Sequence, residues 1–200
     1  MALDLIVIDN FYDKPDDVRS FAINRKDYLK KGLRFETQKL YYTDTLIKRF
    51  EEILGISIQV DPIRYGFGTF NYFPEGDDLH HSTHYDDAEW VGLIYLTPNE
   101  MVGNGGLSLC RHKESGLMGP PNKEWLSKNG FESFEQWVEQ VYKPNKTNVD
   151  AWETTMFIPT RYNRLILKRG GKMFHRGGKG FGKSVTDSRL LQRFFFEEIK

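Results

Sequence analysis

The chain has 200 residues, of which 39% are hydrophobic and 14% aromatic, and its formal net charge is zero. This length suits one domain with a sizeable core, while the zero net charge provides no global field that would attract nucleic acid or an anionic membrane. A single cysteine, Cys110, excludes an intramolecular disulfide, and the sequence has neither a membrane-length apolar stretch nor a basic signal segment, so we expect a cytoplasmic protein.

The first quarter of the chain predicts a short strand and two framework helices. The strand is Leu5–Ile8, and Pro15 suits the first turn of the helix that follows it. A second helix is expected from Asp44 or Thr45 to Gly55. Its apolar residues repeat at helical spacing, and they are Leu46, Ile47, Phe50, Ile53 and Leu54.

From residue 56 onward the pattern changes to short strands separated by turns. Residues 56–60 and 65–73 alternate as half-buried strands do, and residues 91–96 form an apolar run typical of a buried strand. Further strands are expected at residues 107–111, 152–159, 164–168 and 189–197. Helices followed by many short strands predict a mainly β fold, an antiparallel sandwich or jelly roll with N-terminal helices, in one domain over residues 1–200.

A helical insertion of different character interrupts these strands at residues 113–150. Its aromatic and aliphatic residues carry helical spacing over residues 123–142. We expect the insertion to stand beside the mouth of the barrel. Either a lid over the site or a simple brace fits this pattern.

The feature with the clearest chemistry is His84-Tyr85-Asp86, which precedes the buried strand at residues 91–96. In an extended segment, residues i and i+2 point to the same side, so the two side chains can converge on one ion. Imidazole and carboxylate, joined by a second histidine, form the facial triad of non-haem Fe(II) oxygenases. Since a histidine and an aspartate two residues apart also occur by chance, the third ligand is needed to support the assignment.

Five histidines are available, His80, His81, His84, His112 and His175. A lone histidine is by default a satisfied surface or core residue. His175 is the best third ligand because it follows a strand and a turn in the second half of the sheet. His112 is a weaker candidate, since it lies in a polar run that reads as solvated.

Arg189 follows His175 and begins a strand that continues as a Phe-rich run. A guanidinium buried without a partner is costly, and its planar fork matches a carboxylate in two-point geometry. Arg193 has the same strand parity and competes for this role, whereas an ordinary ion pair of Arg189 with Asp187 or a glutamate is the simpler alternative. Ten lysines and arginines lie between residues 161 and 193, either on a solvated sheet face or partly around an anion.

The order of these motifs resembles the Fe(II)/2-oxoglutarate-dependent dioxygenases, and most closely their prolyl-hydroxylase-like branch. The resemblance implies a double-stranded β-helix in which His84, Asp86 and His175 hold Fe(II). It also implies that Arg189 anchors the far carboxylate of 2-oxoglutarate, that O2 is the second co-substrate, and that a tyrosine, for which Tyr72 is our candidate, assists the anchor. The interval from His175 to Arg189 is longer than in this branch, because a glycine-rich loop at residues 176–183 lies between them.

The implied activity is hydroxylation of a peptidyl or small-molecule substrate. Three alternatives remain open from the sequence. A cupin-like metal protein would use the same ligands without 2-oxoglutarate, an oxidative nucleic-acid demethylase would use the basic C-terminal third, and a binding module would have a vestigial iron site. An arginine at position 189 disfavours the first, and the zero net charge disfavours the second.

Overall fold

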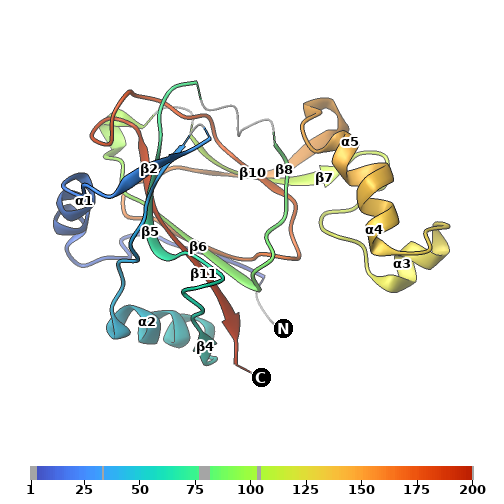
Figure 1. The fold of residues 1–200 in the computed structure, drawn as a ribbon, viewed down its shortest axis with the longest axis horizontal. Coiled ribbons are helices and arrows are strands. Elements are labelled where there is room, and N and C mark those ends of the chain that lie inside the picture. Colours follow the sequence, from blue (N-terminus) through green and yellow to red (C-terminus); the bar gives the residue numbers. More distant parts are fainter. Residues whose placement is uncertain (1–3, 33, 77–81, 103–104, 200) are drawn as a thin grey trace.

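The computed structural model describes residues 4–32, 34–76, 82–102 and 105–199, which form a mainly β protein with two antiparallel sheets (Figure 1). The larger sheet has the strand order β1-β9-β6-β11-β5-β3-β2, with β4 paired to β11, and the smaller has the order β10-β7-β8. The strands are β1 Leu5–Ile8, β2 Tyr28–Lys31, β3 Arg34–Thr37, β4 Ile58–Gln59, β5 Phe67–Phe73, β6 Trp90–Tyr95, β7 Gly106–His112, β8 Trp152–Pro159, β9 Leu165–Arg169, β10 His175–Gly177 and β11 Arg189–Glu198.

Two helices, α1 (Pro15–Ile23) and α2 (Asp44–Leu54), cover the outer face of the larger sheet (Figure 1). The helix α2 begins at its cap Thr43, whose hydroxyl accepts from the Leu46 amide, and ends at Gly55 in the left-handed conformation. Phe50 of α2 packs on Phe194 of β11 with ring centroids 5.1 Å apart. Each buried phenylalanine of this kind contributes about 1.5–3 kcal/mol, so the aromatic cluster fixes the outer layer.

The opposite face of the larger sheet turns toward the smaller sheet. Because side chains alternate along a strand, odd-numbered residues of β6 and β11 point inward and even-numbered residues point to the helices. The register matches Leu191 to Tyr95 and Arg193 to Leu93, so these four side chains share the inner face. This inner face holds the polar site described below and an apolar cluster between the two sheets, formed by Phe73, Tyr95, Leu107, Leu109, Ile158, Ile166 and Leu191.

The insertion is helical, as expected, and carries a small core of its own. It contains α3 (Lys123–Lys128), α4 (Phe134–Trp137), a π turn (Val138–Tyr142) and α5 (Lys143–Asn145), which stand at the far end of the smaller sheet in Figure 1. Short 3-10 turns lie at Asn99–Met101 and Val149–Ala151. Trp137 and Tyr142 pack against Phe174, which precedes β10, so the insertion is anchored to the strand that carries His175.

The strands and helices expected from the sequence are present, with shifts of a few residues at their ends. Two elements were missed. The hairpin of β2 and β3 escaped because half of its residues are charged and it lacks a clean apolar alternation, and β10 escaped because it is only three residues long and leads into a glycine-rich run. The strand expected at residues 56–60 is reduced to β4. Among the helices of the described residues, none is long and apolar enough to cross a membrane.

Candidate metal centre and its pocket

Backbone pairing brings His84 and His175 together. The His84 amide donates to the His175 carbonyl at 2.8 Å, and the His175 amide donates to the His84 carbonyl at 2.7 Å. Residues that face each other in such an antiparallel pair project their side chains to the same side. The two imidazole centroids are therefore only 4.3 Å apart, although the histidines come from distant parts of the chain.

Both imidazole rings are held in the tautomer that binds a metal. The Nδ1 atom of His84 lies 3.1 Å from the Ser82 carbonyl oxygen, and Nδ1 of His175 lies 3.1 Å from the Met173 carbonyl oxygen. A carbonyl oxygen can only accept, so each Nδ1 carries the proton and each Nε2 keeps its lone pair. Backbone carbonyls of this kind orient histidine ligands around metals.

The carboxylate of Asp86 faces the two free Nε2 atoms. Its Oδ2 atom lies 3.2 Å from Nε2 of His175, and its Oδ1 atom lies 4.0 Å from Nε2 of His84. Gly170 allows this approach, since a Cβ at that position would lie 2.1 Å from the Ala88 carbonyl oxygen and 3.2 Å from the Asp86 Cβ. One ligand atom from each of the three residues lies within 4.8 Å of the other two.

A lysine that we did not foresee completes the group. Lys168 of β9 is fully buried, and its ammonium donates to Oδ2 of Asp86 at 2.8 Å. Burial lowers the pKa of Lys168, although the Asp86 carboxylate opposes that shift. In the sequence it looked like one more basic residue of a solvated strand, because nothing local indicates that β9 is covered on both faces.

The protonation states suit a divalent cation. Burial lowers the pKa of both His84 and His175, so both rings are neutral at neutral pH. Burial by itself raises the pKa of the Asp86 carboxyl, but His175, Lys168 and His84 outweigh it and hold that pKa well below its usual range. Neutral imidazoles and an ionised carboxylate are the forms that bind metals.

The donor set fits Fe(II). Two imidazole nitrogens and one carboxylate oxygen on one side of an ion form a facial triad, which leaves the other coordination positions open. His84, Asp86 and His175 line a cavity of about 320 Å³ together with Tyr95, Arg189 and Arg193. This is the size range of small-molecule sites.

Arg189 lies in this cavity as the strand parity predicts. Its side chain is 3% exposed, and its guanidinium carbon stacks over the Phe73 ring at 4.0 Å. Tyr95, on the neighbouring strand β6, is fully buried in the same wall, and the charge of Arg189 is close enough to lower the pKa of its hydroxyl against the larger raising effect of burial. Arg189 and Tyr95 thus form a polar part of the cavity wall.

Tyr72 does not reach this place, and our expectation for it was wrong. The strand β5 alternates, so Phe73 faces the cavity while Tyr72 faces the outer layer, where its ring stacks on Phe35 at 4.6 Å. The tyrosine that lies beside Arg189 is Tyr95, which the sequence offered as a member of an apolar run. Its position nine residues after Asp86, with the parity of the inner face, was the signal that could have found it.

The other site residues considered from the sequence are Arg193 and three histidines, and only Arg193 lines the cavity among those that the structure describes. Arg193 lines the cavity but makes an ion pair with Glu36 of β3. His112 is buried away from the triad, with its Nδ1 2.9 Å from the Ser115 hydroxyl, and is not a ligand. His80 and His81 lie outside the described residues.

Replacing Lys168 by methionine should separate the effect of this lysine on the stability of the metal-free protein from its effect on metal affinity. Without the ammonium, the metal-free protein keeps a buried carboxylate that has lost a partner, and we expect it to lose about 3–5 kcal/mol of stability. The affinity for Co2+ should rise, because the ammonium no longer competes for Asp86. Thermal melting with and without Co2+ measures both, and a weaker Co2+ affinity would mean that Lys168 mainly positions the carboxylate.

The stability of the metal-free protein should fall on acidification. The pKa values of His84 and His175 lie below the ordinary 6.5 in the folded chain. Near pH 6.5 these two histidines therefore bind protons in the unfolded chain but not in the folded chain. The free energy of unfolding therefore decreases as the pH falls below about 6.5. The decrease is at most about 1.4 kcal/mol per pH unit for each of the two histidines. Melting temperatures between pH 7.5 and 5 should show this slope, and His175→Asn should reduce it.

Comparisons with known proteins yield similarity at the level of structure alone. No protein-family model matches the sequence, and no curated protein matches it significantly. The structure resembles HygX from Streptomyces hygroscopicus with nickel and 2-oxoglutarate bound, at 15% identity and a TM-score of 0.47 over 98% of this chain and 83% of that one. The same protein with hygromycin B also bound gives 15% identity, the same coverages and a TM-score of 0.45.

A third similar structure is an N-substituted L-amino acid dioxygenase from Burkholderia ambifaria AMMD, at 10% identity and a TM-score of 0.43 over 98% of this chain and 86% of that one. None of these names is that of a prolyl hydroxylase, so they add nothing to the branch suggested by the sequence motifs. Identities and TM-scores this low carry no assignment of activity. The functional argument therefore rests on the site of this chain.

Proposed function

We propose that this protein is an Fe(II)- and 2-oxoglutarate-dependent hydroxylase that uses O2. The observation that carries the proposal is the convergence of His84, Asp86 and His175 at the wall of a cavity that Arg189 also lines. We further propose that the two sheets are the layers of a double-stranded β-helix, or jelly roll, in a single domain over residues 1–200. The order of the sequence motifs supports the prolyl-hydroxylase-like branch.

In this proposal the far carboxylate of 2-oxoglutarate binds the Arg189 guanidinium. A guanidinium presents two parallel donors to a carboxylate. The guanidinium of Arg189 stacks on the Phe73 ring, which fixes the orientation of its plane. The Tyr95 hydroxyl, buried beside it, is placed to donate a further hydrogen bond. The iron would supply the oxidising chemistry, while decarboxylation of 2-oxoglutarate to succinate accompanies hydroxylation of the substrate.

The residues of the chain also have to position the substrate and exclude water. Leu93 and Leu191 form an apolar part of the cavity wall between the strands of the larger sheet. Tyr142 and Lys146 of the insertion also line this cavity. The insertion thus contributes side chains to the cavity wall, which favours a role in substrate binding over that of a mere brace.

The test is co-substrate turnover by the purified protein. With Fe(II), ascorbate and O2, we expect 2-oxoglutarate to be consumed and succinate to appear in equal amount, at a slow basal rate without substrate. Asp86→Ala should remove this turnover. A protein that binds Fe(II) tightly but neither binds nor consumes 2-oxoglutarate would instead be the cupin-like alternative, and the proposal would then be wrong.

A further inference from the structure

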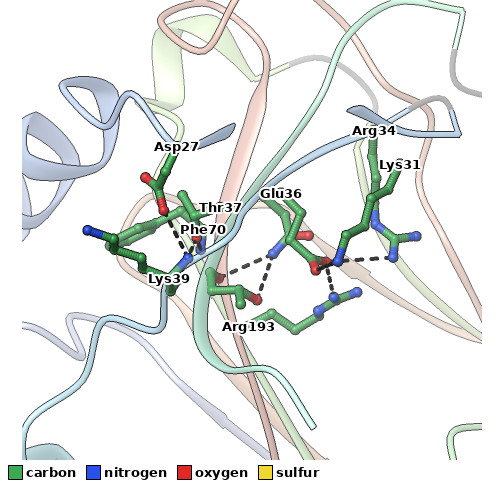
Figure 2. Close-up of polar contacts among 10 residues, drawn as sticks. Asp27, Lys31, Arg34, Glu36, Thr37, Lys39, Phe70 and Arg193 are labelled. Atoms are coloured by element: carbon green, nitrogen blue, oxygen red, sulfur yellow. Dashed lines mark hydrogen bonds and ion pairs between the residues drawn. The ribbon is translucent and has the colours of Figure 1, made fainter. Parts of the chain in front are cut away.

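A second cationic group lies in the cavity wall away from Arg189. Figure 2 shows Lys31 and Arg34 of the β2–β3 hairpin and Arg193 of β11 directed at the carboxylate of Glu36. The Lys31 ammonium lies 2.5 Å from Oε1 of Glu36, and the Arg34 guanidinium lies 3.6 Å from Oε2. Arg193 also pairs with Oε2.

The charges in this group do not cancel. Three cationic side chains surround one carboxylate, so the group carries a net positive charge. Glu36 is only 6% exposed, so this charge lies where water is partly excluded. The Nε atoms of Arg34 and Arg193 are buried without a hydrogen-bond partner among the described residues. Burial lowers the pKa of Arg193 to about 10 against the opposing effect of Glu36, which is consistent with incomplete compensation.

Both arginines line the same cavity as the metal triad. Arg193 follows Arg189 by four residues on the same face of β11, which separates their Cα atoms by about 13 Å at 3.3–3.4 Å per residue. Arg34 and Arg193 line the cavity together with His84, Asp86 and His175, and the charge of Asp86 raises the pKa of Arg193 against the effect of burial. This second group is therefore placed for a ligand other than the 2-oxoglutarate that Arg189 would hold.

We infer that Arg34, supported by Arg193, binds an anionic group of the substrate, and that the substrate is a small molecule bearing a carboxylate. This inference rests on the proposed function and names the substrate class of the same site. Arg34 makes the longer contact with Glu36 and is about a quarter exposed, so its remaining donors are available to a ligand. A planar guanidinium selects a carboxylate in two-point geometry.

The opposite substrate class is an amine, which an unpaired Glu36 carboxylate would attract. Glu36 already has three cationic partners, and a fourth cation at that place would meet Lys31, Arg34 and Arg193 at close range. Like charges within a few ångströms disfavour each other. The group therefore selects for negative charge.

The experiment compares acids with their neutral amides. The N-acetyl derivatives of the common amino acids, each as free acid and as primary amide, are titrated into protein loaded with Ni2+ and 2-oxoglutarate, with binding measured by calorimetry. Ni2+ replaces iron so that no turnover occurs. We expect at least one acid to bind about tenfold or more tightly than its amide, because a charge-assisted pair is lost in the amide.

Two variants locate the effect. Arg34→Gln should remove the preference for the acid, whereas Lys31→Gln should keep it, because Lys31 belongs to the same cluster but does not line the cavity. Equal affinity for acids and amides, binding of neither, or an unchanged preference in Arg34→Gln would each overturn the inference. The 2-oxoglutarate titration that precedes the panel reports on the proposed function separately, so a failure there is distinguishable.

Discussion

Replacing His84 by alanine is expected to abolish Fe(II)-dependent turnover and to weaken binding of Co2+ or Ni2+ by more than a hundredfold. Loss of a residue that only orients a ligand typically costs about 10–100-fold in metal affinity, and loss of a ligand costs more. The fold should persist, because the His84 side chain is about a third exposed and its backbone pairs with His175 whatever the side chain. Metal titration and circular dichroism of the same sample give both results.

His112→Gln is the matched control for this experiment. This histidine is buried and packs on Trp152 rather than near Asp86, so its loss should lower stability without changing metal affinity. If His84→Ala bound Co2+ as tightly as the unaltered protein, the three residues would not be one metal site. The dioxygenase proposal would then lose its main support.

Replacing Arg189 by alanine is expected to weaken 2-oxoglutarate binding by about ten- to a hundredfold or more. A charge-assisted two-point contact is worth roughly 1.5–3 kcal/mol, and each 1.4 kcal/mol is a factor of ten. Arg189→Lys should recover only part of the loss, because an ammonium keeps the charge but not the planar fork. Metal affinity should hardly change, since Arg189 is not a ligand.

Arg193→Gln tests the competing assignment of the anchor. Arg193 already has the Glu36 carboxylate as a partner, so we expect its removal to leave 2-oxoglutarate affinity nearly unchanged while lowering stability. Titration of 2-oxoglutarate into the Ni2+-loaded variants measures both. If Arg193→Gln reproduced the large loss and Arg189→Ala did not, the anchor would lie one step further along the strand, and the metal centre would be unaffected.

Local sequence patterns were sufficient to predict the residues that share a strand face. The spacing of His84 and Asp86 places both side chains on one side of an extended segment, and alternation places Arg189 and Arg193 together on β11. The apolar run at residues 91–96 was long enough to predict the buried strand β6. These predictions hold because parity along a strand does not depend on which strand lies next to it.

Which face becomes the inside is decided only by tertiary packing. Alternation groups Tyr72 with one face of β5 and Phe73 with the other, but α1 and α2 determine that the Tyr72 face is the outer one. The same packing turns Tyr95 toward Arg189 and buries Lys168 against Asp86. No local pattern distinguishes these residues from ordinary members of apolar or basic strands.

Local sequence patterns likewise could not predict the contacts between segments that are distant in the chain. The isolated bridge between His84 and His175 joins two segments far apart in the chain, and this pairing turns two separate histidines into one site. The β2–β3 hairpin brings Arg34 and Glu36 to Arg193 through its pairing with β5, although its charged sequence predicted no strand. By itself the sequence determined which residue types were available and on which side of each strand they stand; only the folded sheets, by burying one face and pairing remote strands, decided which of them meet.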